Sequence, residues 1–92
     1  MVKDLVFEIL PNGRYAAELT STGMRSVVQL SREEKSPVIV YMKVGGMEDY
    51  GASPAFYDAG ENFMFELNLP AGIMVRVESL TSVVAGKLLE EE

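Results

Sequence analysis

Three residue types are missing from this 92-residue chain, which contains no cysteine, no histidine and no tryptophan. Without cysteine the chain can form no disulfide, and it has no thiolate to act as a nucleophile or as a metal ligand. Without histidine it lacks the side chain that most often serves as a general base near neutral pH and as a ligand for transition metals. We therefore expect a protein that is not an enzyme, with no catalytic residue, no cofactor and no bound metal.

Basic residues are few and scattered. Eight lysine and arginine side chains stand singly against fourteen acidic ones, which gives a formal net charge of −6. Because nucleic-acid-binding proteins gather basic residues in a patch, we expect no nucleic-acid partner. No stretch approaches the about eighteen apolar residues of a membrane span, and Lys3, Asp4 and Glu8 interrupt the apolar N-terminal segment. We expect no membrane segment, no signal peptide and a cytoplasmic location, unless a signal was removed beforehand.

Hydrophobic residues, in contrast, make up 48% of the chain, which is ordinary for a folded globular domain. A chain of this length supports one hydrophobic core. We expect a single domain over residues 1–86, followed by an acidic C-terminal tail over residues 87–92. The glutamate run 90–92 in this tail is most simply solvated, and electrostatic docking on a basic partner is the alternative.

Hydrophobic and other residues alternate in several short runs, which is typical of β-strands because successive side chains point to opposite faces of a sheet. The runs cover residues 5–10, 15–20, 25–30, 37–44, 63–69 and 73–78. The turn Pro11-Asn12-Gly13 predicts a hairpin between the first two runs, and Pro70-Ala71-Gly72 predicts another between the last two. One more strand over 79–84 would stop at Ala85-Gly86. The run 37–44 is apolar on both faces in its first half, which favours a central strand.

This rhythm of short strands, with turns about ten residues apart, is typical of small β-sandwiches and barrels. No segment shows the 3.6-residue period of a helix of any length. We predict an all-β fold, namely a small antiparallel β-sandwich, jelly-roll or Ig-like, of six to eight short strands.

Residues 47–62 form the longest irregular stretch, with room for a short edge strand at 55–57. Long loops in compact domains are often functional. With the preceding Gly45-Gly46 this stretch gives a candidate loop over 45–62, whose possible oxygen ligands are Glu48, Asp49, Asp58, Glu61 and Asn62. Such oxygens can hold Ca²⁺, but the alternating ligands and the distal glutamate of a calcium loop are missing. Solvated charges around two turns are the expected interpretation.

The same stretch contains three aromatic residues, Tyr50, Phe56 and Tyr57, which are the candidate binding residues. Three interpretations stay open for them. Phe56, close to Pro54, can close one end of the core. The rings can form a hot spot for a protein partner, or a flat platform for sugar rings.

Several strands carry apolar residues on the face that should point to solvent. These residues are Val6, Leu10, Val27, Ile39, Tyr41, Met64 and Met74. The outer faces of a two-layer sandwich are normally polar, and little chain remains to build a covering layer. We therefore expect another subunit to cover part of this surface, with Ile39, Tyr41, Met64 and Met74 as candidate interface residues. Six methionines favour the same interpretation.

The opening strand Leu-Val-Phe-Glu-Ile-Leu, the Asn-Gly-Arg-Tyr hairpin that ends at Tyr15 and the closing hairpin over 63–80 together resemble small β-sandwich accessory proteins of tailed bacteriophages. The resemblance lies in the strand pattern and transfers no functional residue. It implies a protein made without a signal peptide that binds to copies of itself or to a capsid or tail, so a virion is the alternative location.

Two functions from different classes follow. The first is a structural or protein-interaction module that forms a homo-oligomer or docks on a larger assembly such as a virion. The alternative is a carbohydrate-binding or adhesion domain that uses Tyr50, Phe56 and Tyr57. An enzyme of the carboxylate type is a distant third and would require two acidic groups that converge in a pocket.

Overall fold

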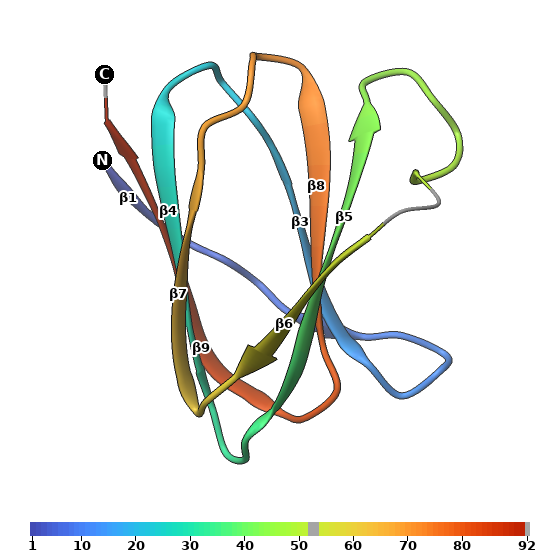
Figure 1. The fold of residues 1–92 in the computed structure, drawn as a ribbon, viewed down its shortest axis with the longest axis vertical. Coiled ribbons are helices and arrows are strands. Elements are labelled where there is room, and N and C mark those ends of the chain that lie inside the picture. Colours follow the sequence, from blue (N-terminus) through green and yellow to red (C-terminus); the bar gives the residue numbers. More distant parts are fainter. Residues whose placement is uncertain (52–53, 92) are drawn as a thin grey trace.

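The computed structural model describes residues 1–51 and 54–91, which form two antiparallel sheets packed face to face (Figure 1). Sheet A contains, in spatial order, β1 (Val2–Asp4), β9 (Val83–Glu91), β4 (Arg25–Arg32) and β7 (Asn62–Leu67). Sheet B contains β2 (Glu8–Ile9), β3 (Tyr15–Thr20), β8 (Ile73–Ser79), β5 (Ser36–Val44) and β6 (Ala55–Ala59). The prediction of an all-β sandwich is confirmed. The strands number nine in the described part of the chain because the first ten residues supply one short strand to each sheet.

The strand order identifies which kind of sandwich this is. Without the two-residue strand β2, sheet A has the order β1-β9-β4-β7 and packs on sheet B, which has the order β3-β8-β5-β6. Most strands that are adjacent in sequence therefore lie in opposite sheets. This is the order of a jelly roll, in which two Greek keys fold over one core. Of the two predicted sandwich types, the structure is therefore the jelly roll. Within residues 1–51 and 54–91 there is no helix that could span a membrane.

The core lies between the sheets. It is built from every second residue of the strands, namely those whose side chains face inward. Its fully buried members are Val28, Leu30, Val38, Val40, Val75 and Val77. Burying a side chain of this size contributes about 1.5–3 kcal/mol. The expectation that 37–44 is a central strand is confirmed, because β5 pairs with β8 on one side and with β6 on the other.

The predicted N-terminal hairpin is present. Glu8 pairs with Ala16 and Ile9 with Tyr15 across the turn. Asn12 accepts a hydrogen bond from the Arg14 backbone N–H at 3.0 Å, and Gly13 has a φ of 84°, which glycine adopts without strain. The segment Pro11-Asn12-Gly13 is therefore the hairpin turn that its sequence predicts.

The predicted second hairpin is wrong. β7 pairs with β4 in sheet A, whereas β8 pairs with β3 and β5 in sheet B. The turn at residues 70–72 carries the chain from one sheet to the other. Alternation identifies a strand and its inward face, but two such strands can face each other across the core as easily as they can pair side by side.

The predicted acidic tail and the predicted strand end at Ala85-Gly86 are also wrong. The chain turns at residues 80–82, and β9 then continues through Gly86 to Glu91, between β1 and β4. Gly86 is needed for space, because a Cβ there would lie 2.7 Å from Cε1 of the Phe7 ring. Residues 87–91 are thus an interior strand of sheet A, and Glu92 lies outside the described residues.

Buried charges close both ends of the core. Arg32 is 3% exposed and Glu90 is 4% exposed. Glu90 pairs in register with Ser26, near the start of β4, and Arg32 is the last residue of that strand. The two side chains therefore occupy opposite ends of the space between the sheets.

Candidate functional site

The three candidate aromatic residues do not form one platform. Tyr57 of β6 turns inward and stacks on Phe65, with ring centroids 5.6 Å apart and an interplanar angle of 24°. Its neighbour Phe56 points to the other face of β6 and is 68% exposed. Tyr50 lies outside sheet B, against Arg76 and Lys43. The structure therefore separates the three rings into a core residue, an exposed residue and a residue of a surface cleft.

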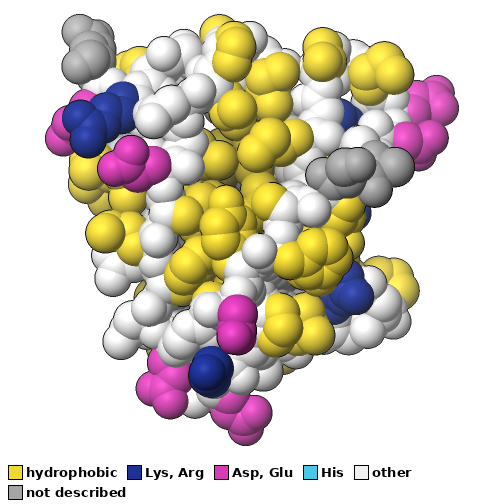
Figure 2. All heavy atoms as spheres, viewed as in Figure 1, with side chains coloured by type: hydrophobic (Ala, Val, Ile, Leu, Met, Phe, Trp, Pro, Cys, Tyr) yellow, Lys and Arg dark blue, Asp and Glu magenta, His cyan; other side chains and the backbone are white. Residues whose placement is uncertain are grey.

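One side of the sandwich is open between the last strands of the two sheets. β6 ends sheet B and β7 ends sheet A, and a two-residue turn joins them. The side chains of Ala55, Tyr57, Phe63 and Leu69 fill the space between these strands, and each remains partly exposed. Figure 2 shows hydrophobic side chains in a band through the middle of this face. We call these four residues, with the neighbouring Phe56, the β6–β7 edge.

The opposite side of the sandwich is closed by the chain itself. Residues 5–7 cross there from β1 in sheet A to β2 in sheet B, and the Leu5 N–H donates to the Gly86 carbonyl at 3.0 Å. The side chains of Leu5 and Phe7 pack against the core. Backbone therefore covers the core on this side, whereas only side chains cover it at the β6–β7 edge.

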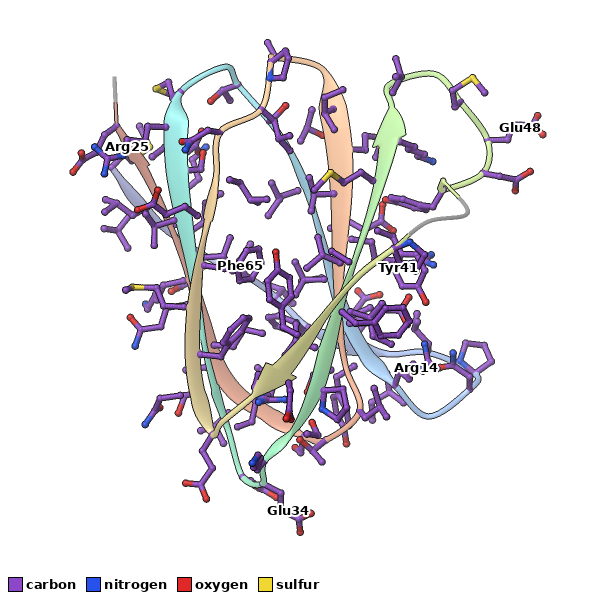
Figure 3. All side chains as sticks on the ribbon, in the orientation of Figure 1. Arg14, Arg25, Glu34, Tyr41, Glu48 and Phe65 are labelled. Atoms are coloured by element: carbon purple, nitrogen blue, oxygen red, sulfur yellow. The ribbon has the colours of Figure 1, made fainter. Side chains whose placement is uncertain are left out.

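A cleft of about 470 Å³ lies on the outer face of sheet B. Its lining residues come from three strands and from the β5–β6 connection, and they are Glu18, Tyr41, Lys43, Glu48, Asp49, Tyr50, Gly51 and Arg76. The register brings them together, because Arg76 of β8 pairs with Glu18 on one side and with Tyr41 on the other. In Figure 3 Tyr41 lies on this outer side of sheet B, and Phe65 lies between the sheets.

Tyr50 anchors the β5–β6 connection on the cleft. Its hydroxyl donates to Oε2 of Glu18 at 2.8 Å. Arg76 Cζ lies 4.6 Å and Lys43 Nζ lies 4.7 Å from the centre of its ring, distances at which cations are attracted to an aromatic ring. Burial, reinforced by the Glu18 carboxylate, raises the pKa of Tyr50 to about 12. Tyr50 is therefore a neutral hydrogen-bond donor at physiological pH.

A buried carboxylate next to the cleft, that of Glu78, forms an ion pair with the lining residue Arg76. Glu78 is 2% exposed although it lies on the outer face of sheet B. Its two oxygens are held by Arg76 Nε at 2.8 Å and by Arg14 Nη1 at 3.2 Å, and Arg14 Nη1 also donates to the Tyr41 hydroxyl at 3.3 Å. Because Arg14 comes from the β2–β3 turn, this network holds that turn over the sheet. The pKa of Arg14 is raised by Glu78 and by Tyr41.

The four predicted interface residues do not form one patch. Met64 is exposed on the outer face of sheet A, while Tyr41 and Met74 are half-buried on the outer face of sheet B. Ile39 is only 3% exposed, so its predicted place on an exposed patch is wrong in the single chain. Alternation shows that a residue points outward, but it reveals neither the sheet to which the residue belongs nor whether its side chain is covered.

The calcium interpretation of residues 45–62 finds no support within the described segments, where no three acidic side chains come together in a way that could hold a metal ion. Glu48 and Asp49 lie at the cleft, Asp58 lies on β6 and Glu61 in the turn after it. The arrangement that does exist offers carboxylates, cations and phenols within one cleft, which suits binding by hydrogen bonds.

Sequence reasoning identified Tyr50 and Tyr41 but missed Glu18, Lys43 and Arg76. A weak signal was present, because Arg76 and Glu78 are two charged residues on the outward side of the strand run 73–78, whose other residues are apolar. The cleft depends on register between strands that are far apart in sequence, which alternation alone does not provide. Comparison of the chain with protein-family models, with curated proteins and with solved structures finds no match.

Proposed function

We propose that the chain is a non-enzymatic structural or protein-interaction module that self-associates through the β6–β7 edge. The observation that carries this proposal is that core aromatic and aliphatic side chains reach the surface there, between two strands that each end a sheet. Aromatic residues bury a large area at a low cost in conformational entropy and dominate many protein interfaces. The partly exposed Tyr57 and Phe63 and the exposed Phe56 supply such rings.

The backbone and the charges of this edge favour the same function. An edge strand presents unpaired N–H and C=O groups that can pair with another chain. A net charge of −6 makes two copies repel each other, so a contact surface between copies must hold few acids. Strands β6 and β7 contain only Asp58 and Glu66 as charged residues, and Arg25 Nη2 lies 3.8 Å from Glu66.

The fold does not by itself choose among functions, because the jelly roll serves viral coat proteins, lectins and other proteins. Participation in a larger assembly such as a virion stays a prediction from the resemblance in strand pattern. A cytoplasmic location is likewise a prediction from the sequence.

The test is sedimentation equilibrium of the full chain from low to high micromolar concentration. We expect reversible self-association, weakened at least about tenfold, which corresponds to 1.4 kcal/mol, by Phe56→Lys. Val84→Lys is the matched control, because Val84 is 67% exposed, almost as much as Phe56, but belongs to β9. A strictly monomeric wild-type chain at high micromolar concentration would contradict the proposal, as would equal weakening by both substitutions.

A further inference from the structure

The cleft on sheet B presents hydrogen-bond donors that the fold does not use up. Arg76 contacts Glu78 through Nε, and its side chain is 29% exposed, which leaves the two Nη groups as donors toward the cleft. Among the described residues, the Lys43 ammonium makes one long hydrogen bond of 3.4 Å, to the Glu48 carbonyl, and lies 4.7 Å from the centre of the Tyr50 ring. A guanidinium fork and an ammonium therefore line a solvent-accessible hollow.

Acceptors lie around the same hollow. Glu48 and Asp49 are exposed on the β5–β6 connection, and Glu18 faces them from β3. One oxygen of Glu18 accepts from the Tyr50 hydroxyl, and its second oxygen has no hydrogen-bond partner within residues 1–51 and 54–91, so it can accept from a ligand. Three carboxylates thus stand against two cations around one cleft.

This mixture of charges disfavours ligands with a strong charge of either sign. An anion would meet three carboxylates within a protein of net charge −6, and a cation would meet Lys43 and Arg76. A hydroxyl group both donates and accepts, so a ligand rich in hydroxyls can satisfy both kinds of group at once. The rings of Tyr41 and Tyr50 also line the cleft, but cations already lie against them, with Arg76 Cζ 5.0 Å and 4.6 Å from their centres, so recognition of a sugar rests on hydrogen bonds.

We propose that this cleft binds a neutral saccharide. The site is largely preformed, because Tyr50 is held by Glu18 and Arg76 is held by Glu78. Binding therefore costs little ordering of side chains. The proposal concerns a different surface from the β6–β7 edge and does not depend on self-association.

A second, smaller hollow lies beside the cleft and indicates a ligand longer than one sugar ring. Glu18 and Arg76 line both hollows. The second one, of about 200 Å³, is further lined by Val6, Glu8, Leu10, Ala16 and Ala17. Because the two hollows share Glu18 and Arg76, they lie next to each other on sheet B, the second one toward β2. We therefore expect a disaccharide to bind more tightly than either of its monosaccharides.

The experiment is a titration of the isotope-labelled full chain, followed by two-dimensional amide NMR. The probes are glucose, galactose, mannose, N-acetylglucosamine, maltose, cellobiose and lactose, each to high millimolar concentration. At least one of these sugars should shift the amide signals of Lys43, Tyr50 and Arg76 in a saturable manner. Lys43→Met and Asp49→Ala should each weaken that binding at least about fivefold, or 1 kcal/mol.

Lys35→Met is the matched control, because Lys35 is exposed in the β4–β5 turn and does not line either hollow. It should leave the dissociation constant within about twofold, a change below 0.5 kcal/mol. The absence of a saturable shift with every sugar would overturn the proposal. Tighter binding of glucose 6-phosphate or glucuronate than of glucose would also overturn it, since an anion site would then be present. Phe56→Lys should not change sugar binding, which separates this test from that of self-association.

Discussion

The two ends of the core bury opposite charges in different ways. At one end, Glu90 lies 2.7 Å from Lys3 Nζ and accepts a hydrogen bond from the Thr22 hydroxyl at 2.6 Å. At the other end, Arg32 donates to the carbonyl and hydroxyl oxygens of Ser36, both at 2.7 Å, and to the carbonyls of Ala59 and Gly60. A charged partner stabilises the first group, whereas neutral oxygens stabilise the second.

The two ends of the core differ because different polar groups are buried at each of them. Arg32 lies where the β4–β5 and β6–β7 connections meet, and the carbonyls of these turns need donors when they are buried. A guanidinium supplies five N–H groups in a fixed plane, which suits several carbonyls at once. Desolvation lowers the pKa of Arg32, which is the cost of placing a cation there without a carboxylate in contact. The comparison indicates that Arg32 acts as a connector of turns, whereas Glu90 acts as half of an ion pair.

The largest expected effect is therefore at Arg32. Arg32→Met keeps an unbranched, largely apolar stem but removes every donor, so the carbonyls of Ser36, Ala59 and Gly60 lose this partner. We expect the free energy of unfolding to fall by about 3 kcal/mol or more, measured by urea denaturation followed by far-UV circular dichroism. Arg25→Met is the control, because Arg25 is exposed and makes one long ion pair at 3.8 Å, so its loss should change stability by less than about 0.5 kcal/mol. Equal stability of the two variants would refute the role of Arg32.

Glu90→Gln should have a smaller effect. The amide still accepts from Thr22 but loses the charge that attracts Lys3. We expect a loss of about 1–2 kcal/mol in the same denaturation experiment. Glu91→Gln provides a control on the next residue of β9, because Glu91 is exposed. A loss of similar size at Glu91 would show that general charge, and not the buried pair, matters.

A fall in pH should weaken the stabilisation by Glu90 but not that by Arg32. Lys3 first, and Thr22 second, hold the pKa of Glu90 below its ordinary value. The stability that this shift provides is fully present above the unfolded carboxyl pKa of about 4.3 and is lost as the pH falls through the lower folded value. The difference in unfolding free energy between wild type and Glu90→Gln should therefore shrink between pH about 6 and pH about 3. The difference between wild type and Arg32→Met should stay constant over this range, because arginine remains protonated; a parallel decline of both differences would contradict the comparison.

The smallest effect is expected at Thr22, which assists Glu90 from the β3–β4 connection. Thr22→Val keeps the shape but removes the hydroxyl, and should cost about 1 kcal/mol. Thr20→Val, at an exposed position of β3, is the control and should be nearly neutral in the same thermal or urea unfolding experiment. A neutral Thr22→Val would assign the whole stabilisation of Glu90 to Lys3.

The sequence allowed the strands to be predicted more reliably than their partners. Alternation identified most strands, because each sandwich strand has one inward face. The burial of Glu90 could not be predicted from the glutamate run 90–92, since its partners Lys3 and Thr22 lie far away in the sequence. The pairing of 63–69 with 73–78 failed for a related reason, because a turn between sheets and a hairpin turn have the same residue types.

The candidate site was predictable in part. Tyr50 and Tyr41 could be singled out as aromatic residues in a loop and on an outward face. Their meeting with Glu18 and Arg76 depends on the order β3-β8-β5 within sheet B, which no local pattern specifies. Likewise, Tyr57 could not be told from Phe56 as the core residue until the register of β6 on β5 was known.

The asymmetry between the two sides of the sandwich limits how copies of the chain can stack. At the closed side, β1 and β2 contain three and two residues, and residues 5–7 run across the gap between them. Strands this short offer a poor template for a further chain. Self-association through the β6–β7 edge, as proposed above, would join copies in closed pairs around a two-fold axis and would leave no second open side for another copy, so that growth into a fibre would be blocked.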